Sequence, residues 1–148
     1  MPESLDSLKT ALDYDLWANL QWLDKVQASP TRETDLPILA HLLGAQLIWL
    51  VRTCGESPTS FTAPEPTTNE FNRVHQEWKA ALTGPLDRMV SYRRLDGEAA
   101  VQSLGNIVRH VANHGTYHRG ELRGLCRARG DEDFPETDYV RYCNLNGL

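Results

Sequence analysis

The segment His110–Leu122 reads HVANHGTYHRGEL and holds three of the five histidines of the chain, one every four residues. Apolar residues recur around it at helical spacing, namely Leu104, Ile107, Val108, Val111, Leu122 and Leu125. At about 100° per residue, His118 falls within this apolar stripe, His114 on its shoulder and His110 outside it. The segment therefore predicts a helix that turns His114 and His118 towards the interior.

Two imidazoles one helical turn apart lie over the same patch of surface, which is the arrangement that two ligands of one metal ion require. The alternative is a pair of core histidines that hydrogen-bond to the backbone or to neighbouring side chains. A dry core would have to satisfy both rings, so we favour a metal. Metalloprotease chemistry is disfavoured, because Gly115 stands where the zinc-protease motif has its general-base glutamate.

The bulk properties of the chain indicate one soluble domain. A length of 148 residues predicts a single domain, 1–148, with one substantial core. The net charge of −5 argues against a nucleic-acid partner, so we interpret the arginines at 109, 119, 123, 127 and 129 as a solvated helix face. We find neither an 18-residue apolar window nor a signal peptide, and expect a cytoplasmic protein with no membrane partner. The three cysteines lack paired spacing, which predicts reduced thiols.

The first helix is predicted from Ser4 to Ala28, with one stripe of leucines and no glycine or proline until Pro30. Asn19 falls at the phase of Leu8 and Leu16, so its amide points towards the core. A buried amide needs partners. Two roles satisfy it equally well, a hydrogen bond across helices or a place beside the proposed metal.

A second helix is predicted from about Asp35, as its capping residue, to Cys54, with Pro37 in the first turn and Gly55 as the stop. Apolar residues follow both of its sides, so we expect burial on both, by the other helices alone or with a partner subunit. His41 lies on the second side and is the natural third imidazole. Helical phase alone does not bring it to the other two.

The segment from Gly55 to Pro66 has a loop composition, and a capping box of Thr67 and Glu70 then opens a third helix. Its predicted stripe is Phe71, Val74, Trp78, Leu82 and Met89. His75 shares this stripe, and we interpret it as a core or rim histidine because it has no histidine one turn away.

Gly84-Pro85 should break the third helix, and the residues that follow suggest a small hairpin around Asp96-Gly97. Ser103 can cap the histidine helix and Gly130 can end it. The tail, Phe134 to Leu148, should pack back on the helices. These segments favour an all-α fold, an antiparallel four-helix bundle with a long connection before the last helix.

Several motifs of the chain resemble those of the DinB-like (DinB/YfiT) superfamily. They are the run from Tyr14 through Trp17-Ala18-Asn19, His41 with Trp49, and His114-Gly-Thr-Tyr117-His118-Arg119-Gly120, with Pro135-Glu-Thr-Asp138-Tyr139 as a closing motif. The resemblance covers nearly the whole chain. It implies a four-helix bundle, usually a homodimer, that binds a divalent metal ion. We expect one transition metal ion, with zinc or nickel favoured.

The ligands implied by the resemblance are His41, His114 and His118, whereas His110 matches a recurrent histidine that is not usually a ligand. Characterised relatives include transferases that use low-molecular-weight thiols, and metal-dependent hydrolases or isomerases. We therefore expect a metal-dependent enzyme that acts on a small electrophile, with Asn19 near the metal or substrate and the general acid or base unidentified. The alternatives are a non-catalytic metal-binding or stress-response dimer, and histidines that are purely structural.

Overall fold

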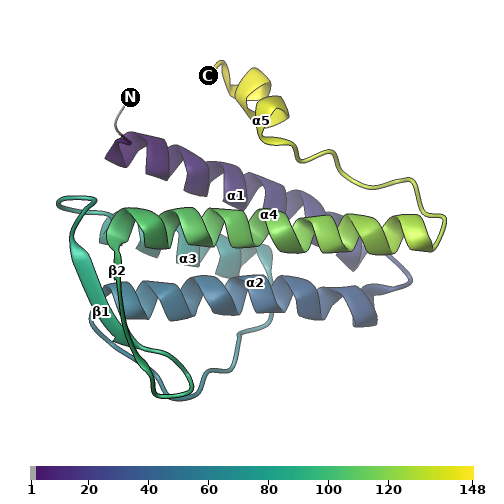
Figure 1. Ribbon diagram of the computed structural model, residues 1–148. Coiled ribbons are helices and arrows are strands. Elements are labelled where there is room, and N and C mark those ends of the chain that lie inside the picture. The colour runs from purple at the N-terminus through teal and green to yellow at the C-terminus, as the bar shows by residue number, and fades with distance from the viewer. Residues whose placement is uncertain (1–2) are drawn as a thin grey trace.

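The computed structural model describes residues 3–148, which are mostly helical, with five helices and one two-stranded sheet. In chain order the elements are α1 (Leu5–Gln27), α2 (Arg32–Thr53), α3 (Thr68–Ala81), β1 (Met89–Arg93), β2 (Ala99–Ser103), α4 (Leu104–Ala128) and α5 (Tyr139–Asn146). Figure 1 shows the hairpin at one end of the long helices, and α5 beyond α1. The all-α expectation is therefore right for most of the chain, and the suggested hairpin is the exception to it.

Helices α1 to α4 pack around a shared core, with α1 and α2 both in contact with α3 and α4. The predicted apolar stripes form this core, and its largest fully buried side chains are Trp22, Trp78 and Phe71. Full burial of one such side chain stabilises the fold by about 1.5–3 kcal/mol. The leucines of α1 and α2 meet there because they recur at helical spacing on one face.

The order of helix directions differs from a simple up-and-down arrangement. Figure 1 shows α1 and α4 running one way and α2 and α3 the other. The connection 54–67 returns along α2 before α3 begins, so α3 does not reverse the direction of α2. The connection 82–103, between α3 and α4, is the long one expected before the histidine helix, and it contains the hairpin.

The helix ends mostly follow their predicted signals. Thr67 Oγ1 accepts a hydrogen bond from the Glu70 amide, and Ser103 Oγ accepts one from the Asn106 amide. The prediction for Asp35 was wrong, because α2 begins three residues earlier, at Arg32, and Asp35 lies inside it. The Asp35 carboxylate is buried and pairs with Arg129 at 2.7 Å, so it ties the start of α2 to the end of α4.

The stripe predicted for α3 was too long. The helix ends at Ala81, and Met89 is an exposed residue at the start of β1. In the hairpin, Val90 pairs with Gln102 and Tyr92 with Ala100. Gly97 stands in the turn at φ +90°, a conformation that side chains with a Cβ rarely adopt.

Helix α2 is apolar on both sides, as predicted, and the 54–67 connection covers the surface between them at Gly44. A Cβ at Gly44 would lie 2.9 Å from Ala63 Cβ and 3.3 Å from Phe61 Cε1, so the 54–67 connection packs directly on the helix. The expectation that no apolar window of 18 residues exists was wrong. Arg32–Thr53 is long and apolar enough to cross a membrane, a test that core helices of soluble proteins also pass.

The tail packs back on α1, as expected. Tyr14 Oη donates to the Thr137 carbonyl at 2.7 Å, and Trp22 Nε1 donates to Thr137 Oγ1 at 3.2 Å. The ring of Phe134 stacks on Trp22. Helix α5, which the sequence did not predict, follows with Tyr139 edge-on to Tyr14.

Candidate metal centre

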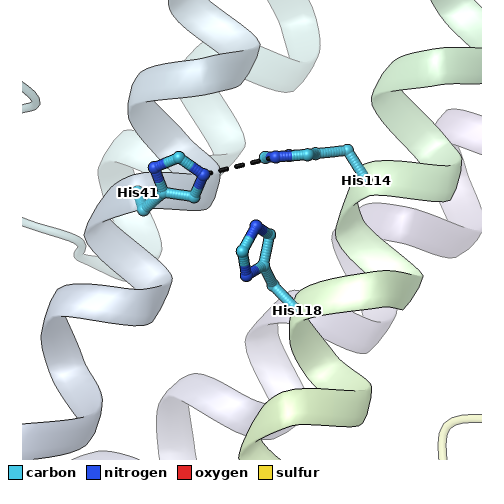
Figure 2. Close-up of side chains that lie close together, drawn as sticks. All are labelled: His41, His114 and His118. Atoms are coloured by element: carbon cyan, nitrogen blue, oxygen red, sulfur yellow. Dashed lines mark hydrogen bonds between the residues drawn. The ribbon is translucent and has the colours of Figure 1, made fainter.

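Three imidazoles meet between α2 and α4, and they are those of His41, His114 and His118. One nitrogen from each ring lies within 4.8 Å of the other two, and the Nε2 atoms of His41 and His114 are 3.2 Å apart. Figure 2 shows His41 on one helix facing His114 and His118 on the other. The fold therefore supplies the juxtaposition that helical phase alone could not establish.

This donor set fits a divalent transition metal. Two imidazole nitrogens on a tetrahedral ion are about 3.3 Å apart when each metal–nitrogen bond is about 2.05 Å. The separation of 3.2 Å between the Nε2 atoms of His41 and His114 is close to that value. The cluster is also accessible, because His41 is exposed and the other two rings are half-buried. A three-histidine site of this kind leaves coordination positions for water or substrate.

The electrostatic environment keeps the rings of His41 and His114 in the form that binds metals. Burial lowers the pKa of His114 to about 4, and the rings of His118, His41 and His110 add to the shift. Burial also lowers the pKa of His41, with a contribution from His118. Both rings are therefore neutral at pH 7 and present a lone pair, so a metal displaces no proton from them.

One carboxylate contacts the cluster. Glu121 Oε2 lies 2.8 Å from Nδ1 of His118, one helical turn along α4. Sequence analysis did not select Glu121. Glu121 could have been found from its position three residues after the predicted ligand His118, because side chains at that spacing are neighbours on a helix.

The other two histidines lie outside the cluster. His110 is an exposed residue that packs between Trp49 and His114. Its ring centroid lies 5.2 Å from that of Trp49 and 5.6 Å from that of His114. Trp49 and His114 also line the same small recess. His75 is buried and its Nε2 lies 2.8 Å from a carboxylate oxygen of Asp13, in agreement with its interpretation as a core or rim histidine.

A buried polar network lies where α4 faces α1. Arg119 Nη1 donates to Asp15 Oδ1 and to Asn19 Oδ1, both at 2.6 Å. Asn19 Nδ2 and Gln46 Nε2 donate to the second Asp15 oxygen, at 3.0 and 2.6 Å. Burial raises the pKa of the Asp15 carboxyl and the Arg119 guanidinium opposes that rise, while three donors on its two oxygens suit an ionised carboxylate.

The solvated role predicted for Arg119 was therefore wrong, since its side chain is 3% exposed. At 100° per residue it falls near 60° from Leu104, just beyond the apolar stripe, and that phase was the available signal. Asn19 makes the cross-helix hydrogen bond that was one of its two predicted roles. Asp15 and Gln46 were missed, although both stand among the leucines of their stripes.

The network and the cluster meet at Gly115, the residue after His114. A Cβ at this position would overlap the Asp15 carboxylate and lie 2.7 Å from Arg119 Nη1. Only a glycine lets α1 approach α4 so closely. The two predicted ligands on α4 therefore lie on either side of a close contact of that helix with α1.

The helices and the histidine cluster define a class, a mostly helical protein with a candidate site for a divalent metal. Residues 25–146 match the DinB family, and the chain belongs to that family. Among curated proteins it is similar to "Protein DinB" of Bacillus subtilis (strain 168), with 23% identity over 155 aligned positions that cover 88% of this chain and 90% of the relative. No solved structure matches the chain.

Proposed function

We propose that this protein binds one divalent transition metal ion, zinc or nickel, through His41, His114 and His118. We further propose that it is an enzyme of the thiol S-transferase or hydrolase type, acting on small electrophilic molecules. The observation that carries the proposal is the convergence of three imidazole nitrogens within 4.8 Å of one another, from two separate helices. A hydrogen bond between the two Nε2 atoms would account for the approach of His41 and His114 alone, whereas a shared ion accounts for all three nitrogens together.

His41, His114 and His118 would hold the ion, which when bound would lower the pKa of a thiol or water and supply positive charge opposite a developing anion. The residues of the chain orient the site. His41 is the exposed member and stands at its rim, whereas His114 and His118 are fixed on α4. A low-molecular-weight thiol suits this site as co-substrate, because the described side chains of the cluster include no cysteine.

Asn19 acts, in this proposal, through the helix that carries two of the ligands. It is fully buried and bonded to Arg119, the residue after His118, so it is out of reach of a substrate. We propose that it positions α4 rather than the substrate. A substitution of Asn19 should then alter metal affinity and activity only if it displaces α4.

The test is metal analysis of untagged protein after gentle purification, followed by turnover of electrophiles with a panel of thiols. Metal-loaded protein should consume thiol and electrophile together, and metal-stripped protein should not. About one ion per chain is expected. His118→Ala should lose the metal, while His110→Ala should keep it, because His110 lies outside the cluster.

A bound ion without turnover of any substrate would instead support the non-catalytic alternative, a metal-binding or stress-response protein. Equal metal loss in His118→Ala and His110→Ala would mean that the ligand set is wrong. Absence of bound metal from protein reconstituted with zinc or nickel would overturn the metal site itself.

A further inference from the structure

Glu121 is the only acidic residue in α4, a helix that carries four arginines. Its carboxylate oxygen nevertheless lies 2.8 Å from a ring nitrogen of His118, and among the described residues Glu121 forms no ion pair with an arginine. A carboxylate has no proton to donate, so Nδ1 of His118 must donate the hydrogen bond. The contact therefore selects one tautomer of a proposed metal ligand.

The selected tautomer leaves the lone pair on the other ring nitrogen, Nε2. Figure 2 shows one nitrogen of the His118 ring directed towards the gap between His41 and His114, and the other directed away from it. Metal-binding histidines commonly hold their second nitrogen against a carboxylate, which fixes the ring and strengthens its donor atom. His118 has this arrangement in the structure.

We propose that Glu121 is a positioning residue for the metal, which holds His118 with Nε2 facing the site and strengthens it as a ligand. The inference rests on the proposed metal site and extends it to a residue outside the three histidines. A surface ion pair is the competing explanation. The Glu121 side chain is 49% exposed, so a pair of that kind would add little to the stability of α4 and would leave the metal unaffected.

The first measurement uses metal-free protein and does not depend on the proposed function. The ¹⁵N shifts of the His118 ring report which nitrogen carries the proton. We expect the Nδ1–H tautomer in the wild type and a shift towards Nε2–H in Glu121→Ala. An Nε2–H ring in the wild type would overturn the proposal.

The second measurement is the affinity for Zn²⁺, by competition with a chromophoric chelator. Glu121→Ala should weaken binding by about 10- to 100-fold. Glu121→Gln should fall between the two proteins, because its amide oxygen still accepts the Nδ1–H bond but carries no charge. The control is Glu77→Ala, which removes an equally exposed carboxylate paired with Arg73 on α3 and should leave the affinity unchanged.

Equal Zn²⁺ affinity in the wild type and Glu121→Ala would overturn the role of Glu121 while leaving the metal site intact. An equal loss in Glu77→Ala would trace the effect to net charge and would also overturn it. A wild type that binds no Zn²⁺ would instead refute the proposed function, and the tautomer measurement would still decide whether the Glu121–His118 bond exists. Circular dichroism checks that each variant keeps its helices.

Discussion

At the scale of single residues, neighbouring residues of α4 contact different helices. His114 and His118 face His41 on α2, whereas the next residue after each, Gly115 and Arg119, meets α1. The register of the whole helix is therefore constrained from two sides within one turn. A change on the α1 side should be felt on the α2 side, because a helix moves as a rigid unit.

Gly115→Ala tests this constraint. The added methyl group would overlap the buried Asp15 carboxylate, so we expect a loss of about 1–3 kcal/mol in the free energy of unfolding. Metal affinity should fall as well, because His114 and His118 move with the displaced backbone. Chemical denaturation and zinc competition measure the two effects.

The control is Gly120→Ala on the same helix, where an added Cβ has no neighbour within 4 Å. Alanine is the better helix former, so this change should leave stability unchanged or raise it by up to about 1 kcal/mol. Wild-type stability and metal affinity in Gly115→Ala would show that the close approach of α1 and α4 does not constrain the site.

Asn19→Leu separates the two roles of the buried amide. Leucine makes the α1 stripe continuous but leaves Arg119 Nη1 with one acceptor fewer in a dry environment. We expect a loss of about 1–3 kcal/mol in unfolding free energy. If Asn19 also positions the metal helix, zinc affinity should fall in addition, and a stability change with unaltered metal binding would contradict that role.

The residues of the site were predictable to different degrees. His114 and His118 could be paired from their spacing alone, since one helical turn separates them. His41 was the natural third imidazole, but only the resemblance to a family placed it with the other two, because its approach depends on how α2 packs against α4. Arg119 was misread because basic residues are usually solvated, and its partner Asp15 lies on another helix a hundred residues away in sequence.

At the scale of the elements, the proposed ion joins α2 to α4, while α1 and α3 contribute no histidine to the cluster. A ligand that binds only the folded protein stabilises it by mass action. Zinc at 100 times its Kd should therefore raise the free energy of unfolding by about 2.7 kcal/mol. Thermal melts with and without zinc measure the shift.

His118→Ala should lose this zinc-dependent shift, and His75→Ala should keep it, because His75 pairs with Asp13 away from the cluster. His75→Ala is expected to melt lower in both conditions, since it leaves a gap on α3. A full zinc response in His118→Ala would show that the ion binds elsewhere.

The boundaries of the elements were predicted well where a local cap decides them and poorly where a distant partner does. Thr67 and Ser103 form local caps, and both predictions were confirmed. Asp35 was assigned as a cap, but Arg129 draws its carboxylate into an ion pair across the fold. Sequence pattern near Asp35 contains no information about Arg129.

At the scale of the whole molecule, the surplus apolar surface of α2 motivates a homodimer. The 54–67 connection covers α2 at Gly44, but a recess of about 540 Å³ remains near its start, lined in part by Leu36, Pro37 and Ala40. A two-fold contact there would bury the same patch on both copies. Sedimentation at tens of micromolar should show a dimer.

Leu36→Lys should shift this equilibrium towards the monomer, because it replaces an apolar side chain of the recess with a charged one. Val140→Lys, on the exposed surface of α5, is the matched control and should leave the dimer intact. A wild-type monomer at these concentrations would count against self-association.

The general architecture followed from the spacing of apolar residues, which located the four long helices, and from the turn at Asp96-Gly97, which located the hairpin. The directions of the helices did not, because a long connection can return to either end of the preceding helix, and the route of 54–67 depends on Phe61 and Ala63 packing on α2. Helix α5 was missed because it spans only eight residues, Tyr139–Asn146, which are too few to establish a helical period.

The contact of Trp49 with His110, beside the recess it shares with His114, gives the protein an optical reporter. Paramagnetic Cu²⁺ or Ni²⁺ at the three histidines should quench the fluorescence of Trp49, whereas Zn²⁺ should leave it bright. Trp22 and Trp78 emit from the core, so Trp49→Phe should remove the response and keep most of the emission. The intrinsic tryptophan fluorescence would then distinguish bound Cu²⁺ or Ni²⁺ from bound Zn²⁺.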